Sequence, residues 1–167
     1  MLDDVVLQRS AAQLGQNLLA RGWRVATAES CTGGGIGCAL TTVAGSSMWF
    51  EGGIIAYSNQ VKQRYLDVSA STLQQMGAVS EAVVVQMAQA ARRHFAVDIA
   101  VAVSGIAGPG GAQCGKPVGC VCFAWALAEH ALSETAYFQG DREMVRWQTV
   151  YHALLGLLKC SENKVNE

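Results

Sequence analysis

Ser47, Lys62 and Tyr57 are side chains that could carry out nucleophilic chemistry, and they lie around one short apolar segment over residues 50–57, which Tyr57 ends. A hydroxyl is a weak nucleophile at neutral pH unless a base takes its proton. A lysine that burial keeps neutral can act as that base without a histidine. We therefore predict Ser47 as the nucleophile and Lys62 as its base, with Tyr57 beside them to orient or relay the proton.

The turn Ser30, Cys31, Thr32 and Gly33 is a second candidate, because it joins a predicted strand over 23–28 to a predicted helix over 35–43. Small residues at a helix start let backbone amides approach an anion or a carbonyl. Serine and threonine are favoured there even without a ligand, so a plain capped helix start remains an open alternative. Cys31 could have a lowered pKa at a helix start. None of the three histidines lies in a glycine-rich turn beside it, so we interpret Cys31 as structural or pocket-lining.

Arg142 and Arg146 are four residues apart in the predicted final helix, which places them on one face. Such a pair can hold a phosphate. A solvated basic face paired with nearby acidic residues is the alternative, and the spacing leaves both open. Ser104 and Gly105 follow a predicted central strand over 98–103 and begin another glycine-rich loop.

Two further patterns carry less weight. Residues 110–116 fit the start of a phosphate-binding loop, but Pro117 stands where that motif needs a serine or threonine, which argues against an ATPase. The six cysteines include no Cys-x-x-Cys pair. Cys120 and Cys122 share a strand face, yet no fourth ligand has a familiar spacing, so packing is favoured over zinc. We expect no metal and no other cofactor.

Helices and strands alternate along most of the chain. Helices are predicted over 5–20, 35–43, 59–66, from two caps at Ser69 and Ser80, and over 141–159, with strands over 23–28, 50–57, 98–103, 117–127 and 131–138. The last two strands are expected to pair antiparallel. The fold class is therefore α/β, with three α/β/α layers around a mixed, mostly parallel sheet. Ligands bind such folds beyond the carboxyl ends of the parallel strands.

The chain has 167 residues, of which 51% are hydrophobic and 15% charged, as expected for one compact domain over residues 1–160 with a polar tail over 161–167. A net charge of −1 gives no general attraction to nucleic acid. The apolar stretches are shorter than the roughly 20 residues that span a bilayer, and the N-terminus is acidic. We expect a cytoplasmic protein that binds neither nucleic acid nor membrane.

Seven segments, in order and spacing, resemble the CinA C-terminal family in its stand-alone form. They are residues 27–34, 45–47, 57–62, 77–81, 104–109, 116–119 and 140–142. The resemblance covers roughly residues 14–153. It implies a nicotinamide-nucleotide amidase that converts nicotinamide mononucleotide (NMN) to nicotinic acid mononucleotide and ammonia in pyridine nucleotide recycling, without a metal.

The resemblance also implies roles for particular residues. The family's serine nucleophile falls on Ser47 and its lysine base on Lys62, with Tyr57 beside them. The turn at Ser30 and the segment at Ser104 would line the same pocket, and a basic residue near the last helix start would meet the phosphate. For partners we expect this small-molecule nucleotide and further copies of the chain in a homo-oligomer. The alternative is a non-catalytic nucleotide-binding or regulatory module.

Overall fold

The structure is a computed structural model that describes residues 4–128 and 130–162. Within these ranges the elements follow in the order α1 (Asp4–Arg21), β1 (Val25–Glu29), α2 (Gly35–Thr41), η1 (Ser46–Met48), β2 (Phe50–Ile55), α3 (Asn59–Leu66), α4 (Ala70–Met76), α5 (Glu81–Phe95), β3 (Ile99–Gly105), β4 (Cys120–Ala126), β5 (Ala131–Tyr137) and α6 (Arg142–Glu162). These elements match the predicted ones to within a few residues at their ends.

The strands form one sheet in the order β2-β1-β3-β4-β5. β1 pairs parallel with both β2 and β3, whereas β4 pairs antiparallel with both β3 and β5. Four strands therefore run in one direction and β4 runs against them, as the mixed and mostly parallel prediction requires. The antiparallel pairing of the last two strands is also confirmed.

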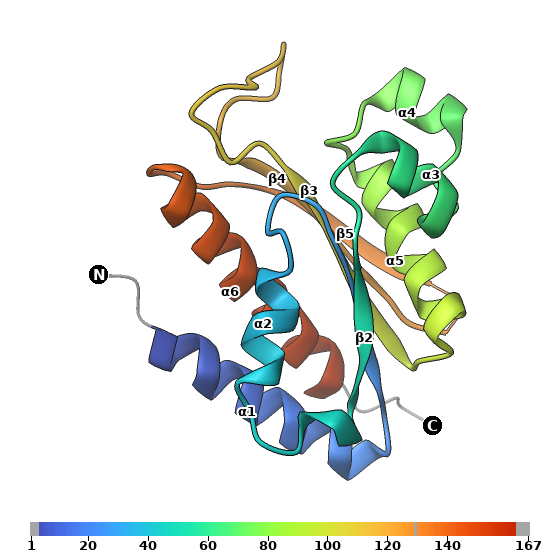
Figure 1. Cartoon of the computed structure of the whole chain (residues 1–167), viewed down its shortest axis with the longest axis vertical. Helices are drawn as coiled ribbons and strands as arrows, with labels where there is room; N and C mark the ends of the chain where they lie inside the picture. Colours follow the sequence, from blue (N-terminus) through green and yellow to red (C-terminus); the bar gives the residue numbers. More distant parts are fainter. Residues whose placement is uncertain (1–3, 129, 163–167) are drawn as a thin grey trace.

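Helices cover both faces of the sheet, with α1, α2 and α6 on one side and α3, α4 and α5 on the other (Figure 1). The three-layer prediction is thus confirmed. Side chains alternate along β3, so that Val101 and Val103 join the core under α1 and α6 while Ala100 and Ala102 join the core under α5. The alanines on the second face are small, which lets α5 pack close to the sheet.

Local capping explains several helix starts. Ser69 and Ser80 each accept a hydrogen bond from the amide three residues later, so both predicted caps are confirmed. The side chain of Asp141 does the same for α6, at 2.9 Å. The final helix extends to Glu162, two residues beyond the predicted domain end at 160, and residues 163–167 of the predicted tail lie outside the described residues.

The direction of the strands decides where a site can form. β1, β2, β3 and β5 all end at the same edge of the sheet, where they lead into the turn after β1, the start of α3, the loop after β3 and the start of α6 (Figure 1). Four segments that are distant in sequence therefore meet at this carboxyl edge.

Candidate active site

A buried serine and a buried lysine meet at the carboxyl edge of the sheet. Ser30 directly follows β1, and Lys62 lies on α3. The Ser30 Oγ and Lys62 Nζ atoms lie 3.0 Å apart, and the two residues are only 8% and 1% exposed. Parallel pairing of β1 with β2 aligns Glu29 with Ile55, which is why the segments that follow the two strands come together.

The surroundings of Lys62 favour its neutral form. Its Nζ lies 2.8 Å from the carbonyl oxygen of Ala56 and 3.5 Å from that of Tyr57. Burial lowers the pKa of the Lys62 ammonium from its ordinary value of 10.5. Among the ion pairs within the described ranges, none includes Lys62. A neutral amine has two N–H groups for the two carbonyls and one lone pair for the hydroxyl proton of Ser30.

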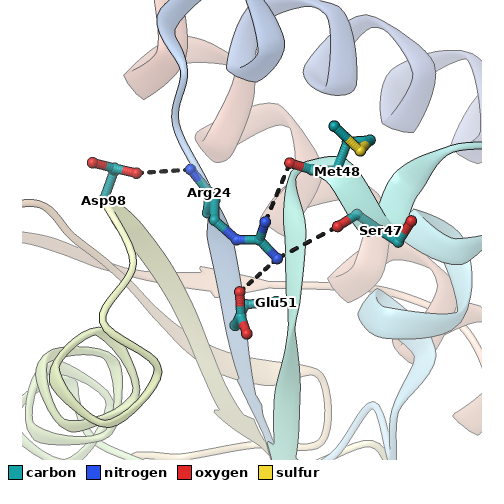
Figure 2. Close-up of polar contacts among 5 residues, drawn as sticks. All are labelled: Arg24, Ser47, Met48, Glu51 and Asp98. Carbon is teal, nitrogen blue, oxygen red and sulfur yellow. Dashed lines mark hydrogen bonds and ion pairs between the residues drawn. The ribbon is translucent and has the colours of Figure 1, made fainter.

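Ser47 lies near the amino end of β2, at the opposite end of the strands from the site. The structure therefore corrects the predicted pairing of Ser47 with Lys62. Ser47 belongs to η1, which precedes β2, whereas Lys62 follows β2. Six strand residues span about 20 Å, which is too far for a hydrogen bond. Figure 2 shows Ser47 and Met48 beside Arg24, whose guanidinium donates to both carbonyls at 3.4 Å and pairs with Glu51. Ser47 thus belongs to an ion-paired corner of the fold.

Tyr57 and Arg142 form part of the rim of the site. The side chain of Tyr57 is exposed, and its Oη accepts a hydrogen bond of 2.9 Å from Arg142 Nη2. Arg142 Nη1 donates to the carbonyl of Gly108, also at 2.9 Å. The backbone carbonyl of Tyr57 approaches Lys62, while its phenol is held by Arg142. The structure therefore brings Tyr57 to the site but holds its phenol at the rim.

A cavity of about 280 Å³ opens in front of the serine and lysine. Its lining includes Ser30, Cys31, Tyr57, Lys62, Ser104, Gly105 and Arg142. The hydroxyl of Ser104 donates a hydrogen bond of 2.7 Å to the carbonyl of Ala78, which fixes that side chain at the wall. A larger hollow of about 750 Å³ lies among α1, α2 and α6, but neither Ser30 nor Lys62 lines it, so we place the chemistry in the smaller cavity.

The start of α2 is occupied by a carboxylate from the chain itself. Glu29 is 1% exposed and accepts hydrogen bonds from the amides of Ile36 and Gly37, at 2.9 and 2.8 Å, and from the hydroxyl of Thr32 at 2.7 Å. The negative charge of Glu29 fills the place that an anion would take at this helix start. The amides of Ile36 and Gly37 are therefore not free to bind an anion from a ligand. This corrects the predicted anion cradle at the Ser30 turn for these two amides.

The two arginines of α6 serve different places. Arg142 lines the cavity, whereas Arg146 lines only the larger hollow. Arg146 Nε donates to the carbonyl of Cys31 at 3.2 Å, and its Nη2 donates to the carbonyl of Thr32 at 2.8 Å. The predicted pair on one helix face is thus divided, with Arg142 facing the cavity and Arg146 bound to the backbone of the Ser30 turn. Gly33, at φ 60°, lies beside the Arg146 guanidinium.

Cys31 stays a neutral thiol in this setting. Burial raises the pKa of the Cys31 thiol to about 12. The thiolate is the reactive form, so Cys31 is a poor nucleophile at neutral pH despite its place beside Ser30.

Residues 4–128 and 130–162 contain no group of three or more metal-binding side chains and no helix with the length and apolar character needed to cross a membrane.

Sequence reasoning missed Glu29 and gave Ser30 only a binding role. The available signal was an acidic residue at the end of a buried strand, directly before a serine and a glycine-rich helix start. A strand, tight turn and helix can hold a nucleophile at the turn, as in the nucleophile elbow of other α/β enzymes. The sequence alone does not distinguish Glu29 from any other acidic residue. Its role in holding the start of α2 depends on backbone amides that only the folded chain brings to it.

Comparison with known proteins places the chain in a family. The sequence profile of the CinA C-terminal domain matches residues 7–161, and the chain belongs to this family. It is 50% identical to the nicotinamide-nucleotide amidohydrolase PncC of Pseudomonas putida over 149 residues, which is 89% of this chain and 93% of that protein. It is 48% identical to the protein of the same name from Escherichia coli K12, over 92% of this chain and 93% of that one.

A solved structure agrees with this placement. The crystal structure of the competence damage-inducible protein A from Klebsiella pneumoniae superposes with a TM-score of 0.89 at 39% identity, and the match covers 92% of this chain and 95% of that one. The α/β fold is therefore the fold of this family.

Proposed function

We propose that this chain is a nicotinamide-nucleotide amidohydrolase, which converts NMN to nicotinic acid mononucleotide and ammonia. The names of the two PncC relatives, which the chain matches over about nine-tenths of both lengths, support the substrate. The observation that carries the chemistry is the 3.0 Å contact between Ser30 Oγ and Lys62 Nζ inside a cavity. We assign Ser30 as the nucleophile in place of Ser47.

The first half of the reaction forms an acyl-enzyme. Neutral Lys62 takes the hydroxyl proton of Ser30 as the Oγ atom attacks the carboxamide carbon. The electron pair of the C=O bond moves to oxygen and gives a tetrahedral intermediate. The intermediate collapses, the C–N bond breaks, and the proton held on Lys62 passes to the leaving nitrogen. Ammonia leaves, and the acyl group of nicotinic acid mononucleotide, with its ribosyl phosphate still attached, remains as an ester on Ser30.

The second half reverses the roles with water. Lys62 is again neutral and takes a proton from a water molecule that attacks the ester carbon. The bond to Ser30 Oγ then breaks, the oxygen recovers its proton from Lys62, and the carboxylic acid product is released. The carbonyls of Ala56 and Tyr57 hold the Lys62 amine in place through both halves, so that the same lone pair serves twice.

Arg142 is the residue best placed to bind the phosphate of the nucleotide. It lines the cavity from the start of α6, and its two described hydrogen bonds use one N–H of each terminal nitrogen. The remaining N–H groups can bind phosphate oxygens. Ser104 and Gly105 also line the cavity and would contact the nucleoside. Binding of the phosphate then positions the carboxamide at Ser30.

Ammonia release from NMN tests the proposal. We expect the purified chain to release ammonia, with or without a chelator, and to act far more slowly on free nicotinamide. Ser30→Ala should remove turnover, and Ser47→Ala, which removes a hydroxyl at the other edge of the sheet, is the matched control and should keep it. Turnover in Ser30→Ala, or none in the unmodified chain, would contradict the proposal. The second result would favour a non-catalytic nucleotide-binding module.

Three further expectations remain proposals beside this one. A nucleotide amidase would act in pyridine nucleotide recycling, would be placed in the cytoplasm where such nucleotides are made, and would consist of the single amidase domain over residues 1–160 in a homo-oligomer. Light scattering on the purified chain tests the oligomer, since a monomer would give the mass of 17.7 kDa.

A further inference from the structure

We infer that Lys116 is a positioning residue, whose ammonium attaches the glycine-rich loop over residues 106–119 to the end of α4 and so holds one wall of the cavity in the shape that binds the nucleotide. The inference rests on the proposed function, because it takes the ligand of this cavity to be the nucleotide substrate. It gives a role to a lysine that has none in the proposed chemistry.

The loop between β3 and β4 supplies a large part of the cavity wall. It projects from the end of the sheet where β3 ends and β4 begins (Figure 1). The residues of the loop that line the cavity are Ile106, Ala107, Gly108, Gly110, Gly111 and Gln113. Ala78 and Val79, which follow α4, supply another part of the lining. The shape of the cavity therefore depends on how the loop lies relative to the end of α4.

The composition of the loop gives it little rigidity of its own. Residues 108–115 include four glycines, and glycine loses more conformational freedom on ordering than any other residue. At the base of the loop, the amide of Ile106 donates to the carbonyl of Cys120 at 2.9 Å. At its tip, the backbones of Gln113 and Lys116 bond to each other in both directions, each at 2.9 Å. These bonds shape the base and the tip but do not attach the tip to the rest of the domain.

The side chain of Lys116 makes that attachment. Its Nζ donates a hydrogen bond of 2.7 Å to the carbonyl of Met76, the last residue of α4. Among the described residues, this is the only hydrogen bond that joins residues 109–116 to another part of the chain. The last carbonyls of a helix have no partner within the helix and carry a partial negative charge, so an ammonium is a favourable partner for them. The contact thus links two parts of the cavity wall.

Lys116 is placed to act through the loop rather than on the substrate. The cavity lining, among the described residues, includes Gln113 but not Lys116. In a phosphate-binding loop the lysine at this position of the motif would reach a phosphate, whereas here it binds a helix carbonyl. A Cβ added at Gly77 would lie 3.3 Å from the Lys116 Nζ, so the ammonium lies close against the backbone at the end of α4.

An attached loop lowers the cost of binding a substrate. A ligand that has to order a flexible wall loses part of its binding free energy to that ordering, and a wall that is already ordered imposes no such cost. The proposed nucleophile and base lie after β1 and on α3, away from the contact between Lys116 and Met76. Lys116 should therefore affect the binding of the substrate and leave the chemical step unchanged.

Steady-state kinetics on NMN and on nicotinamide riboside test the inference. Lys116→Met keeps the apolar stem and removes the donor. We expect KM for NMN to rise about fivefold to twentyfold with kcat within about twofold, and kcat/KM for the riboside, which lacks the phosphate, to fall by a similar factor. Lys116→Arg keeps a charged donor and should restore much of the affinity. Lys159→Met removes an exposed lysine of α6 and is the matched control, which should change neither substrate's kinetics. Lys116→Gln carries the same comparison if Lys116→Met fails to fold.

A nitroxide label on Cys114 reports the motion of the loop without turnover. Cys114 is exposed at the tip, and replacing the other exposed cysteine, Cys38, by serine directs the label to it. The electron paramagnetic resonance spectrum should show faster motion of the label in Lys116→Met and no change in Lys159→Met. In a Ser30→Ala background NMN should bind without turnover, and saturating NMN should slow the label again in Lys116→Met.

Several outcomes would overturn the inference. An unchanged KM for NMN in Lys116→Met, or an unchanged label spectrum, would each show that the cavity does not depend on this contact. A fall in kcat with KM unchanged would give Lys116 a role in the chemical step, and a loss confined to NMN would make it a phosphate ligand. Turnover of NMN by Ser30→Ala, or none by the unmodified chain, would instead reject the proposed function, while the label would still measure whether Lys116 holds the loop.

Discussion

Arg142 donates a hydrogen bond of 2.9 Å to the phenol oxygen of Tyr57, which ties the start of α6 to the segment between β2 and α3. We predict that Arg142→Gln raises KM for NMN about tenfold or more and changes kcat less, because Arg142 is the residue that we propose binds the phosphate. Nicotinamide riboside lacks the phosphate and should lose little. Steady-state kinetics on both substrates checks this, and an equal loss on both would argue against a phosphate contact.

Tyr57→Phe separates the phenol from the backbone of the same residue. The variant loses the hydrogen bond to Arg142 but keeps the carbonyl that lies 3.5 Å from Lys62 Nζ. If the phenol only holds Arg142, we expect KM to rise about threefold while kcat remains within about twofold. A fall in kcat of a hundredfold or more, measured by ammonia release, would return the phenol to the proton transfer that the sequence analysis gave it.

The pH dependence of the rate should report the protonation of Lys62. Only the neutral amine can take the Ser30 proton, so kcat/KM should rise with pH through an apparent pKa below 10.5, in the direction that burial shifts it. Lys62→Arg should be inactive at every pH, since a guanidinium cannot be deprotonated in a protein. Activity in Lys62→Arg would show that the position needs a charge and not a base.

The same burial predicts a pH-dependent stability. The folded-state pKa of Lys62 lies below the unfolded value, so between these two values the unfolded chain binds more protons, and stability rises with pH across that window. The cost of burying the ammonium is fully present below it. In Lys62→Met this contribution is absent. The Tm of the variant minus that of the unmodified chain should therefore decrease from neutral pH toward pH 10, and a constant difference would contradict the buried ammonium.

Cys31→Ala should keep at least about a third of the activity. Burial raises the pKa of the Cys31 thiol to about 12, which makes it a poor nucleophile at neutral pH. Mass spectrometry after a rapid quench with NMN should find Ser30 esterified by the acyl group of nicotinic acid mononucleotide. The corresponding thioester on Cys31, or complete loss of turnover in Cys31→Ala, would reverse the assignment of the nucleophile.

Glu29→Gln should destabilise the fold by about 2 kcal/mol or more. The carboxylate accepts three hydrogen bonds, whereas the glutamine amide would direct its NH2 group at a backbone N–H and leave it unpaired. The free energy of unfolding in urea measures the effect. Glu51→Gln is the matched control, since Glu51 is a part-exposed partner of Arg24, and it should cost less than about 1 kcal/mol. Equal effects would deny Glu29 a special role.

Local features of the fold could be predicted from the sequence. The caps at Ser69 and Ser80 depend on the amides three residues ahead, and the alternation of Ala100, Val101 and Ala102 follows from strand geometry. These interactions form between residues that are close in the sequence, so the spacing of residue types is enough to predict them. The end of α6 extended past the predicted boundary because Ser161 packs on α1, where its hydroxyl accepts a hydrogen bond from Asn17 at 3.0 Å.

The choice of serine could not be made in the same way. Ser47 is nearer to Lys62 along the chain, but a whole strand lies between them and places them at opposite edges of the sheet. Ser30 is 32 residues from Lys62 and yet in contact with it, since the parallel pairing of β1 and β2 aligns their ends. Which strands become neighbours is decided by packing of the whole domain. The separate places of Arg142 and Arg146 likewise depend on how α6 docks.

The docking of α6 against α1 has a consequence for how the site is assembled. Leu14 and Leu18 of α1 pack in one core with Leu154 and Leu157 of α6, at the end of α6 that is far from the cavity. The near end carries Arg142, and the next turn carries Arg146. A chain that stops before α6 would lose Val145, Leu154 and Leu157 from this core, together with Arg142, the residue proposed to bind the phosphate. The proposed nucleophile and base therefore lie in a part of the chain that is made well before the proposed phosphate ligand, and the cavity is complete only when the last helix packs on the first.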